Sequence, residues 1–145
     1  MEPLDLSILN VTVKPIASRT VLRLITTLKS SISNTDMSEE REEFVRWFES
    51  FYQHIDSKKM PFCIIYKFDD ISNPEDLKFF LDILKGKREL TKKYSIGTCI
   101  VAPPLISLAV NMVIGMYQSD GAIHIVETLD EAKQLCRTRA VKRQE

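Results

Sequence analysis

Short apolar runs alternate along the chain with longer segments whose apolar residues recur at every third or fourth position. Residues 8–16 alternate between apolar and polar, and residues 21–29 are rich in β-branched side chains, so together they predict a β-hairpin. The runs at 62–68 and 95–102 are almost continuously apolar, which is typical of central parallel strands covered on both faces. Residues 122–127 predict one more strand.

Helices are predicted between these strands. The segment 38–56 places its large apolar residues on one helical face, namely Phe44, Trp47, Phe48, Phe51 and Ile55. A second helix begins at Asn73-Pro74 and ends near Tyr94, with Gly86 as a weak point. The segment 105–117 is apolar nearly all round, and Thr128–Glu131 forms a capping box that opens a last helix. Beyond about Arg139 we expect a polar, frayed end.

The predicted order of elements is β-β-α-β-α-β-α-β-α. Strands that alternate with helices pair in parallel through right-handed crossovers, and the opening hairpin adds an antiparallel part. The sequence therefore predicts an α/β fold with a mixed, mostly parallel sheet. The 145 residues fit a single domain, with a core over about 8–136 and a basic tail over 137–145.

Charge and composition exclude some classes of partner. Lys and Arg together number 20, as do Asp and Glu, so the formal net charge is zero. A nucleic-acid binder or a polybasic membrane anchor needs an excess of positive charge. Two prolines interrupt the apolar stretch 99–117, which favours a strand and a buried helix over a membrane span. With no signal-like start, we expect a cytoplasmic protein.

Several stretches resemble the STAS domain, the fold of bacterial anti-sigma-factor antagonists and of the cytoplasmic tails of sulfate transporters. The stretches are an apolar strand running into an acidic turn and helix (IIYKFDDISNPEDLKFFLDIL), a CIVAPP strand before an apolar helix, and a strand before a capped helix (IHIVETLDEAKQL). The resemblance covers roughly Ile8 to Cys136. It implies a regulatory domain that binds a protein partner, and it is shared in part with the lipid-binding CRAL-TRIO domains.

The resemblance also bears on phosphorylation. Antagonists of the STAS family carry a D-S-S-G-L-G-like motif after the third strand, and the partner kinase phosphorylates its serine. Here that stretch reads DDISNPE, without glycine, and Ser72 is the serine nearest to that position. Ser72 is therefore the candidate phosphosite, at a helix start where a phosphate would meet unpaired N–H groups. A cap for that helix is the alternative.

The candidate site is the acidic segment 69–76 together with the neighbouring apolar helix 105–117. Ligands of open α/β sheets bind at the carboxyl ends of the strands, where this segment lies. Its members are Asp69, Asp70, Ser72, Asn73, Glu75 and Asp76, joined by the adaptable side chains of Met112 and Met116. An acidic Mg²⁺ site of an enzyme is a weaker alternative, because the lysine and threonine that such a site needs are missing from later strands.

Nothing else in the sequence indicates catalysis. His54 and His124 have no carboxylate or thiol at metal-ligand spacing, and Cys63, Cys99 and Cys136 are interpreted as buried apolar residues. We therefore expect no cofactor, no metal and no catalytic residue. The leading hypothesis is a non-catalytic module that binds a protein partner or a second copy of itself. The alternative is a domain that binds a small lipid or nucleotide beneath the helix 105–117.

Overall fold

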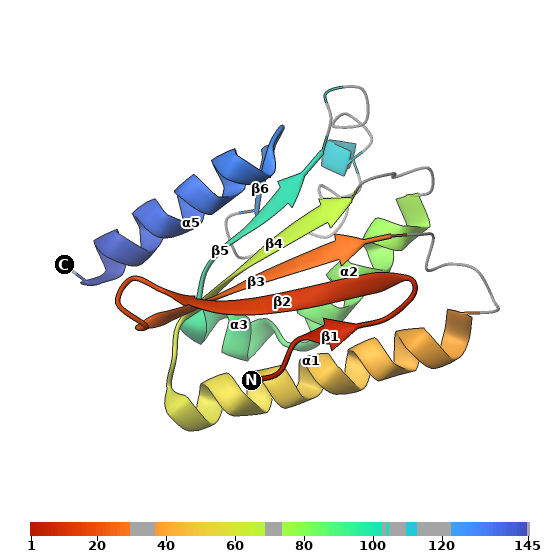
Figure 1. The fold of residues 1–145 in the computed structure, drawn as a ribbon, viewed down its shortest axis with the longest axis horizontal. Coiled ribbons are helices and arrows are strands. Elements are labelled where there is room, and N and C mark those ends of the chain that lie inside the picture. Colours follow the sequence, from red (N-terminus) through yellow and green to blue (C-terminus); the bar gives the residue numbers. More distant parts are fainter. Residues whose placement is uncertain (30–36, 69–73, 103, 105–109, 113–122, 145) are drawn as a thin grey trace.

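The computed structural model of the chain describes residues 1–29, 37–68, 74–102, 104, 110–112 and 123–144 (Figure 1). Its centre is a six-stranded sheet in which the strands follow one another in chain order. The strands are β1 (Leu4–Asp5), β2 (Leu9–Ile16), β3 (Val21–Leu28), β4 (Phe62–Phe68), β5 (Ser95–Val101) and β6 (Ile123–Val126). The helices are α1 (Ser38–Lys58), α2 (Pro74–Gly86), α3 (Arg88–Tyr94) and α5 (Leu129–Gln144).

The sheet is mixed, as the sequence predicts. Strands β1, β2 and β3 pair in antiparallel fashion, and β3, β4, β5 and β6 pair in parallel. The predicted hairpin and the three later strands are therefore confirmed. Two details differ: the two-residue strand β1 was not predicted, and the single helix expected up to Tyr94 is divided into α2 and α3.

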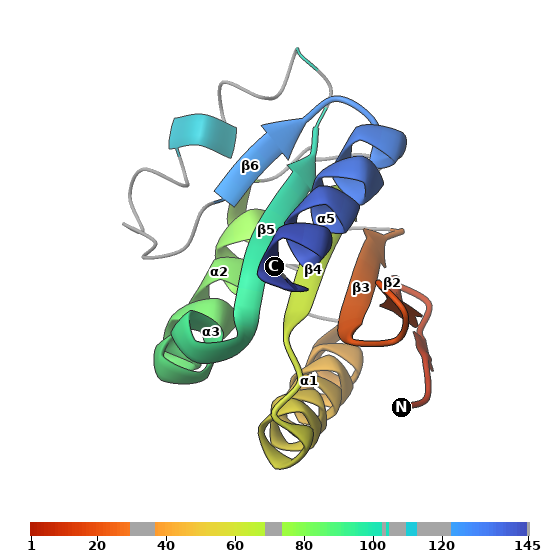
Figure 2. The ribbon, with the colours of Figure 1, turned by 90° about the vertical axis from the view of Figure 1, so that its left-hand side faces the viewer.

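Helices cover the two faces of the sheet unequally. Helices α1, α2 and α3 lie on one face, whereas α5 lies on the other (Figure 2). Parallel strands that are added in one direction through right-handed crossovers place every connecting helix on the same face. Helix α5 does not connect two described strands, so no such crossover holds it on that face, and it covers the opposite one.

The larger core lies beneath α1, α2 and α3 and is built mainly from aromatic rings. The Phe80 ring lies 5.5 Å from Phe44 on α1 and 5.1 Å from Tyr66 on β4, measured between ring centroids. Two tyrosines at its edge satisfy their hydroxyl groups: Tyr52 shares a 2.9 Å hydrogen bond with Thr91, and Tyr94 donates to Asp56 over 3.0 Å. The predicted core face of the first helix is therefore correct.

The smaller core lies beneath α5. It joins Cys63, Ile65, Cys99 and Val101 of the sheet to Ala132 and Cys136 of the helix. Small side chains four residues apart share one helical face and let the helix approach the sheet closely. Ala140 continues this row and is fully buried. The expectation of a frayed end beyond Arg139 is therefore wrong, because the helix continues to Gln144.

The capping box predicted at the start of α5 is confirmed in part. The Glu131 backbone N–H donates to the Thr128 hydroxyl over 3.2 Å, and that hydroxyl donates to the Glu131 carboxylate over 3.3 Å. Thr128 thereby satisfies one orphan N–H group at the helix start, whereas the Glu131 carboxylate bonds the hydroxyl of Thr128 and not its backbone N–H.

A bulge in β5 fixes the far end of α5. The register between β4 and β5 shifts, since Phe62 pairs with Ser95 and Cys63 pairs with Gly97. Gly97 has a φ of +151°, which L side chains rarely adopt. The Arg139 guanidinium occupies the space above it, where a Cβ atom on Gly97 would lie 2.8 Å from Nη1.

Two glycine substitutions should change stability in opposite directions. Gly97→Ala places a side chain at a positive φ and displaces Arg139, so it should lower the free energy of unfolding by about 1–2 kcal/mol. Gly86→Ala meets no atom within 4 Å and replaces a helical glycine, so it should raise that free energy by about 0.5–1 kcal/mol. Urea denaturation measures both, and equal effects would contradict this account of the bulge.

Candidate functional site

One part of the sheet is left open by the unequal helix coverage. Helix α5 packs mainly on β5, with fewer contacts to β4 and β6. In the part of the chain that the structure describes, only the flank of α5 reaches β3 on this face, and most of β2 is left uncovered there (Figure 1). Thr12 and Lys14 of β2 are exposed there. Because this surface is the flat, uncovered side of a paired sheet, it offers an area for contact.

Four neighbouring positions form a row across this face. Lys14 pairs with Arg23, Arg23 pairs with Cys63, and Cys63 pairs with Gly97, over which Arg139 lies. Residues that pair directly across strands point to the same face. Lys14 and Arg23 are therefore two like charges directly opposite each other, an arrangement that destabilises a sheet. Such a local cost is a mark of a functional position.

Arg23 is the most unusual member of the row. Its side chain is only 8% exposed, and its Nε atom has no hydrogen-bond partner among the described residues. The guanidinium lies close enough to Cys136 of α5 to influence the charge of that thiol. Across the described ranges no ion pair is formed by Lys14, Arg23 or Arg139. A buried cation without a counter-anion carries an uncompensated desolvation cost.

Arg139 lies at the other end of the row, over Gly97. Its Nη1 donates to the Ile96 carbonyl over 3.0 Å, and its Nη2 contacts the Nε2 atom of His124. Burial, followed by the charge of Arg139, lowers the pKa of His124 below the ordinary 6.5. The imidazole is therefore neutral at pH 7 and accepts a hydrogen bond from the guanidinium. As expected from strand alternation, His124 points away from the side of Ile123 and Ile125.

The three cysteines come together between the two arginines. All three are buried and free, as the sequence predicts. Thiol–thiol interaction with Cys63, together with burial, raises the pKa of Cys136 to about 12. Interaction with Cys136 and burial likewise raise the pKa of Cys99. These thiols stay protonated near pH 7, so they serve as packing groups rather than as nucleophiles.

Helix α5 adds further positive charge beside the open face. It carries five basic and two acidic residues, and both acidic residues, Asp130 and Glu131, are in its first turn. Lys133 and Arg137 are one turn apart and lie on the flank opposite to Arg139, which faces β5 and β6. They therefore face the β3 side. We call Lys14, Arg23, Lys133 and Arg137 the cationic face.

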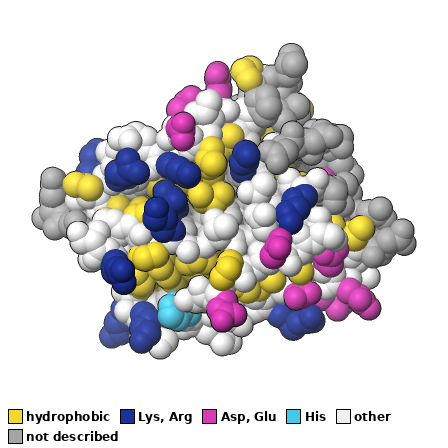
Figure 3. Space-filling view, viewed as in Figure 1, with side chains coloured by type: hydrophobic (Ala, Val, Ile, Leu, Met, Phe, Trp, Pro, Cys, Tyr) yellow, Lys and Arg dark blue, Asp and Glu magenta, His cyan; other side chains and the backbone are white. Residues whose placement is uncertain are grey.

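Figure 3 shows Lys and Arg side chains gathered between α5 and the open strands. On the other side of the sheet, α1 carries six acidic and only three basic residues. Sequence reasoning missed the cationic face, and its one visible signal was Arg23 inside the otherwise apolar stretch VLRLITTL.

The site predicted from the sequence lies largely outside the described residues. This holds for Asp69, Asp70, Ser72, Asn73 and Met116, and for the side chain of Glu75. Of the two members that are described, Asp76 is only 1% exposed, whereas Met112 is 68% exposed. Only Met112 therefore offers surface to a partner. The contact role of the acidic segment and the phosphorylation of Ser72 stay predictions.

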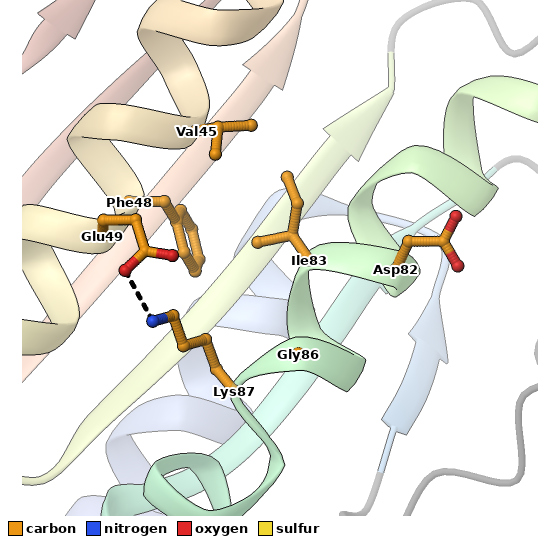
Figure 4. A pocket seen from close by; sticks show the side chains of 7 residues that line it. All are labelled: Val45, Phe48, Glu49, Asp82, Ile83, Gly86 and Lys87. Carbon is orange, nitrogen blue, oxygen red and sulfur yellow. Dashed lines mark hydrogen bonds and ion pairs between the residues drawn. The ribbon is translucent and has the colours of Figure 1, made fainter.

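A small cavity lies elsewhere, between α1 and α2 (Figure 4). Its volume is about 180 Å³, and its lining includes Val45, Phe48 and Ile83. At its rim Lys87 and Glu49 point toward each other and form a 2.6 Å ion pair, while Asp82 points away from them. Pockets for drug-sized ligands span about 300–1,000 Å³. This cavity is therefore too small for a lipid or nucleotide, and the pocket expected for such a ligand beneath the segment 105–117 lies outside the described residues.

Within the described ranges, no group of three or more His, Cys, Asp and Glu side chains is arranged to hold a metal ion. Of the helices that the structure describes, none combines the length and the apolar character that crossing a membrane requires.

Comparisons with known proteins assign no family: no protein-family model, no curated protein and no solved structure matches the chain. The geometry of the cationic face therefore carries the functional argument.

The lowered pKa of His124 predicts a dependence of stability on pH. In the unfolded chain a histidine titrates near pH 6.5, so below that pH the unfolded state binds the proton first. The free energy of unfolding should therefore fall as the pH decreases below about 6.5, until the folded imidazole also becomes protonated. NMR titration of the His124 ring measures its pKa. Arg139→Gln should raise this pKa, and a wild-type value at or above 6.5 would contradict the arrangement.

Proposed function

We propose that this chain is a non-catalytic interaction module of the STAS-like type, which binds an acidic protein partner on its cationic face. The observation that carries the proposal is the directly opposed pair of Lys14 and Arg23 on an uncovered part of the sheet. A like-charge pair at this position is unfavourable in the free protein. Binding of a negatively charged surface turns the same pair into a favourable contact.

The STAS-like assignment is supported by the arrangement of the parallel strands. The alternation of strand and helix on which the resemblance rests recurs from β3 to β5 and again from β6 to α5. The opening hairpin adjoins the parallel strands at β3, as the resemblance implies. A fold of this kind is compatible with several functions, so the role is argued from the site.

A binding role is supported by the charge distribution and by the state of the neighbouring thiols. The basic side chains of α5 extend the positive surface beyond the sheet, which widens the area over which an acidic partner is attracted. The raised pKa values of Cys99 and Cys136 keep both thiols protonated, which favours a packing role for them over a nucleophilic one.

Charge reversal on the cationic face tests this function. The probe is a fluorescent oligoglutamate peptide, and its binding is followed by fluorescence anisotropy at low salt. The double variant Lys14→Glu/Arg137→Glu should bind the peptide roughly tenfold more weakly, because attraction is replaced by repulsion. Salt at 1 M should also weaken binding to the wild type, since the screening length falls from about 10 Å to about 3 Å.

The matched control is Lys58→Glu/Lys92→Glu, which changes the net charge equally at exposed positions of α1 and α3. Its affinity for oligoglutamate should stay within about twofold of the wild type, because the changes lie in the opposite helix layer. Equal losses in both double variants would show non-specific attraction. That result, or the absence of saturable binding to the wild type, would overturn the proposal.

A further inference from the structure

Among the described residues, the nearly buried side chain of Arg23 has no anion to neutralise its charge. A guanidinium keeps its charge at all pH values at which proteins are folded. Removal of such a charge from water is strongly unfavourable unless an opposite charge compensates for it. Arg23 is only 8% exposed, and among the described residues its Nε atom finds no acceptor. An anion from outside the described part of the chain would remove this deficit.

The acidic side chains nearest to this face in the sheet and in α5 are occupied or distant. Asp5 shares the face, since it pairs with Asn10, but its carboxylate forms a 2.9 Å ion pair with Lys29. Asp130 and Glu131 are in the first turn of α5, and Arg23 lies beside Cys136, more than one turn further along. The unpartnered charge of Arg23 therefore points to an anion supplied by a ligand.

The number and kind of cations indicate the class of that anion. Lys14 and Arg23 carry two positive charges at directly paired positions, so a dianion would neutralise both. A phosphoryl group carries a charge of about −1.5 to −2 at pH 7. Its oxygens match the forked donors of a guanidinium, and an ammonium group binds it as a point charge. A single carboxylate would leave one of the two cations unpaired.

The exposure of the two side chains defines how such a group would enter. Lys14 is exposed and Arg23 is nearly buried, so the pair forms a site with an open outer cation and a deep inner one. Thr12 is exposed on the same face, two residues from Lys14 along β2, and offers a further hydroxyl donor. The arrangement suits a charged group that projects from a larger partner.

We infer that Arg23 and Lys14 form a subsite for a phosphoryl dianion, carried by a phosphorylated side chain of the partner protein. This inference rests on the proposed function, since the subsite lies within the cationic face. It adds that partner recognition depends on phosphorylation.

Two titrations followed by ¹H–¹⁵N NMR test the subsite. Inorganic phosphate replaces chloride at constant ionic strength and pH 7, and the backbone amides of Lys14, Arg23 and Cys63 should shift in a saturable manner. In the second titration, an oligoglutamate peptide with one central phosphoserine is compared with the same peptide carrying serine. The phosphorylated peptide should bind about tenfold more tightly, because charge-assisted bonds to the guanidinium form only with the phosphoryl group.

Variants separate the subsite from general charge effects. Arg23→Gln should abolish the phosphate-induced shifts. Lys14→Gln changes an exposed residue and therefore keeps the fold, and it should weaken phosphate binding by about three- to tenfold. Lys58→Gln on α1 is the matched control and should leave the phosphate affinity unchanged.

The outcomes distinguish this inference from the proposed function. If oligoglutamate binds the cationic face but phosphate moves none of the three amides, the subsite is overturned and the interaction module stands. If phosphate binds there but oligoglutamate does not bind, the subsite stands and the proposed function fails. Equal affinity of the two peptides, with phosphate still bound at Arg23, would overturn the phosphorylated partner in favour of a small phosphate ester.

Discussion

The arrangement of the whole molecule depends on the direction in which the parallel strands are added. Strands β3 to β6 follow one another across the sheet, and right-handed crossovers place the preceding helices on one face. Among the described helices, α5 is the one that lies on the other face, and one helix is not wide enough to cover six strands. Its packing on β5 and β4 brings its flank to β3 and leaves Thr12 and Lys14 of β2 exposed. The cationic face lies at the edge of the sheet area that α5 covers.

Arg23 lies at the edge of the area that α5 covers, and this position explains why its side chain is nearly buried. It lies on β3, beside β4, whose Cys63 packs directly under α5. The flank of the helix therefore removes the guanidinium from water, while the open sheet beside it leaves room for a ligand. The three cysteine thiols lie beneath α5 and are buried, whereas Lys14 lies beyond the edge of this helix and is exposed. The two properties required of a binding site, desolvation and access, are thus found on adjacent strands.

Sequence reasoning succeeded for elements that have a local pattern of apolar residues. It failed where the packing of a distant helix decides which side chains of the sheet are buried. The run 62–68 predicts its strand because burial on both faces makes it continuously apolar, and α1 is predicted because burial of one face imposes a helical period. Strand β1 escaped detection because two residues are too few for a pattern. Arg23 was visible as a charged residue in an apolar strand, but no local pattern shows which part of a sheet face a distant helix covers. Likewise, the burial of Ala140 and the contact of Arg139 with Gly97 depend on packing across 40 residues of chain or more.

The account makes Arg23 a residue retained for binding at the expense of stability. Arg23→Met keeps the length of the side chain and removes the buried charge, so the free energy of unfolding provides the most direct test. Without added anions, urea denaturation should show that the variant is more stable than the wild type by about 1 kcal/mol or more. A variant less stable than the wild type would contradict the account, because it would mean that the folded protein itself already satisfies the charge of Arg23.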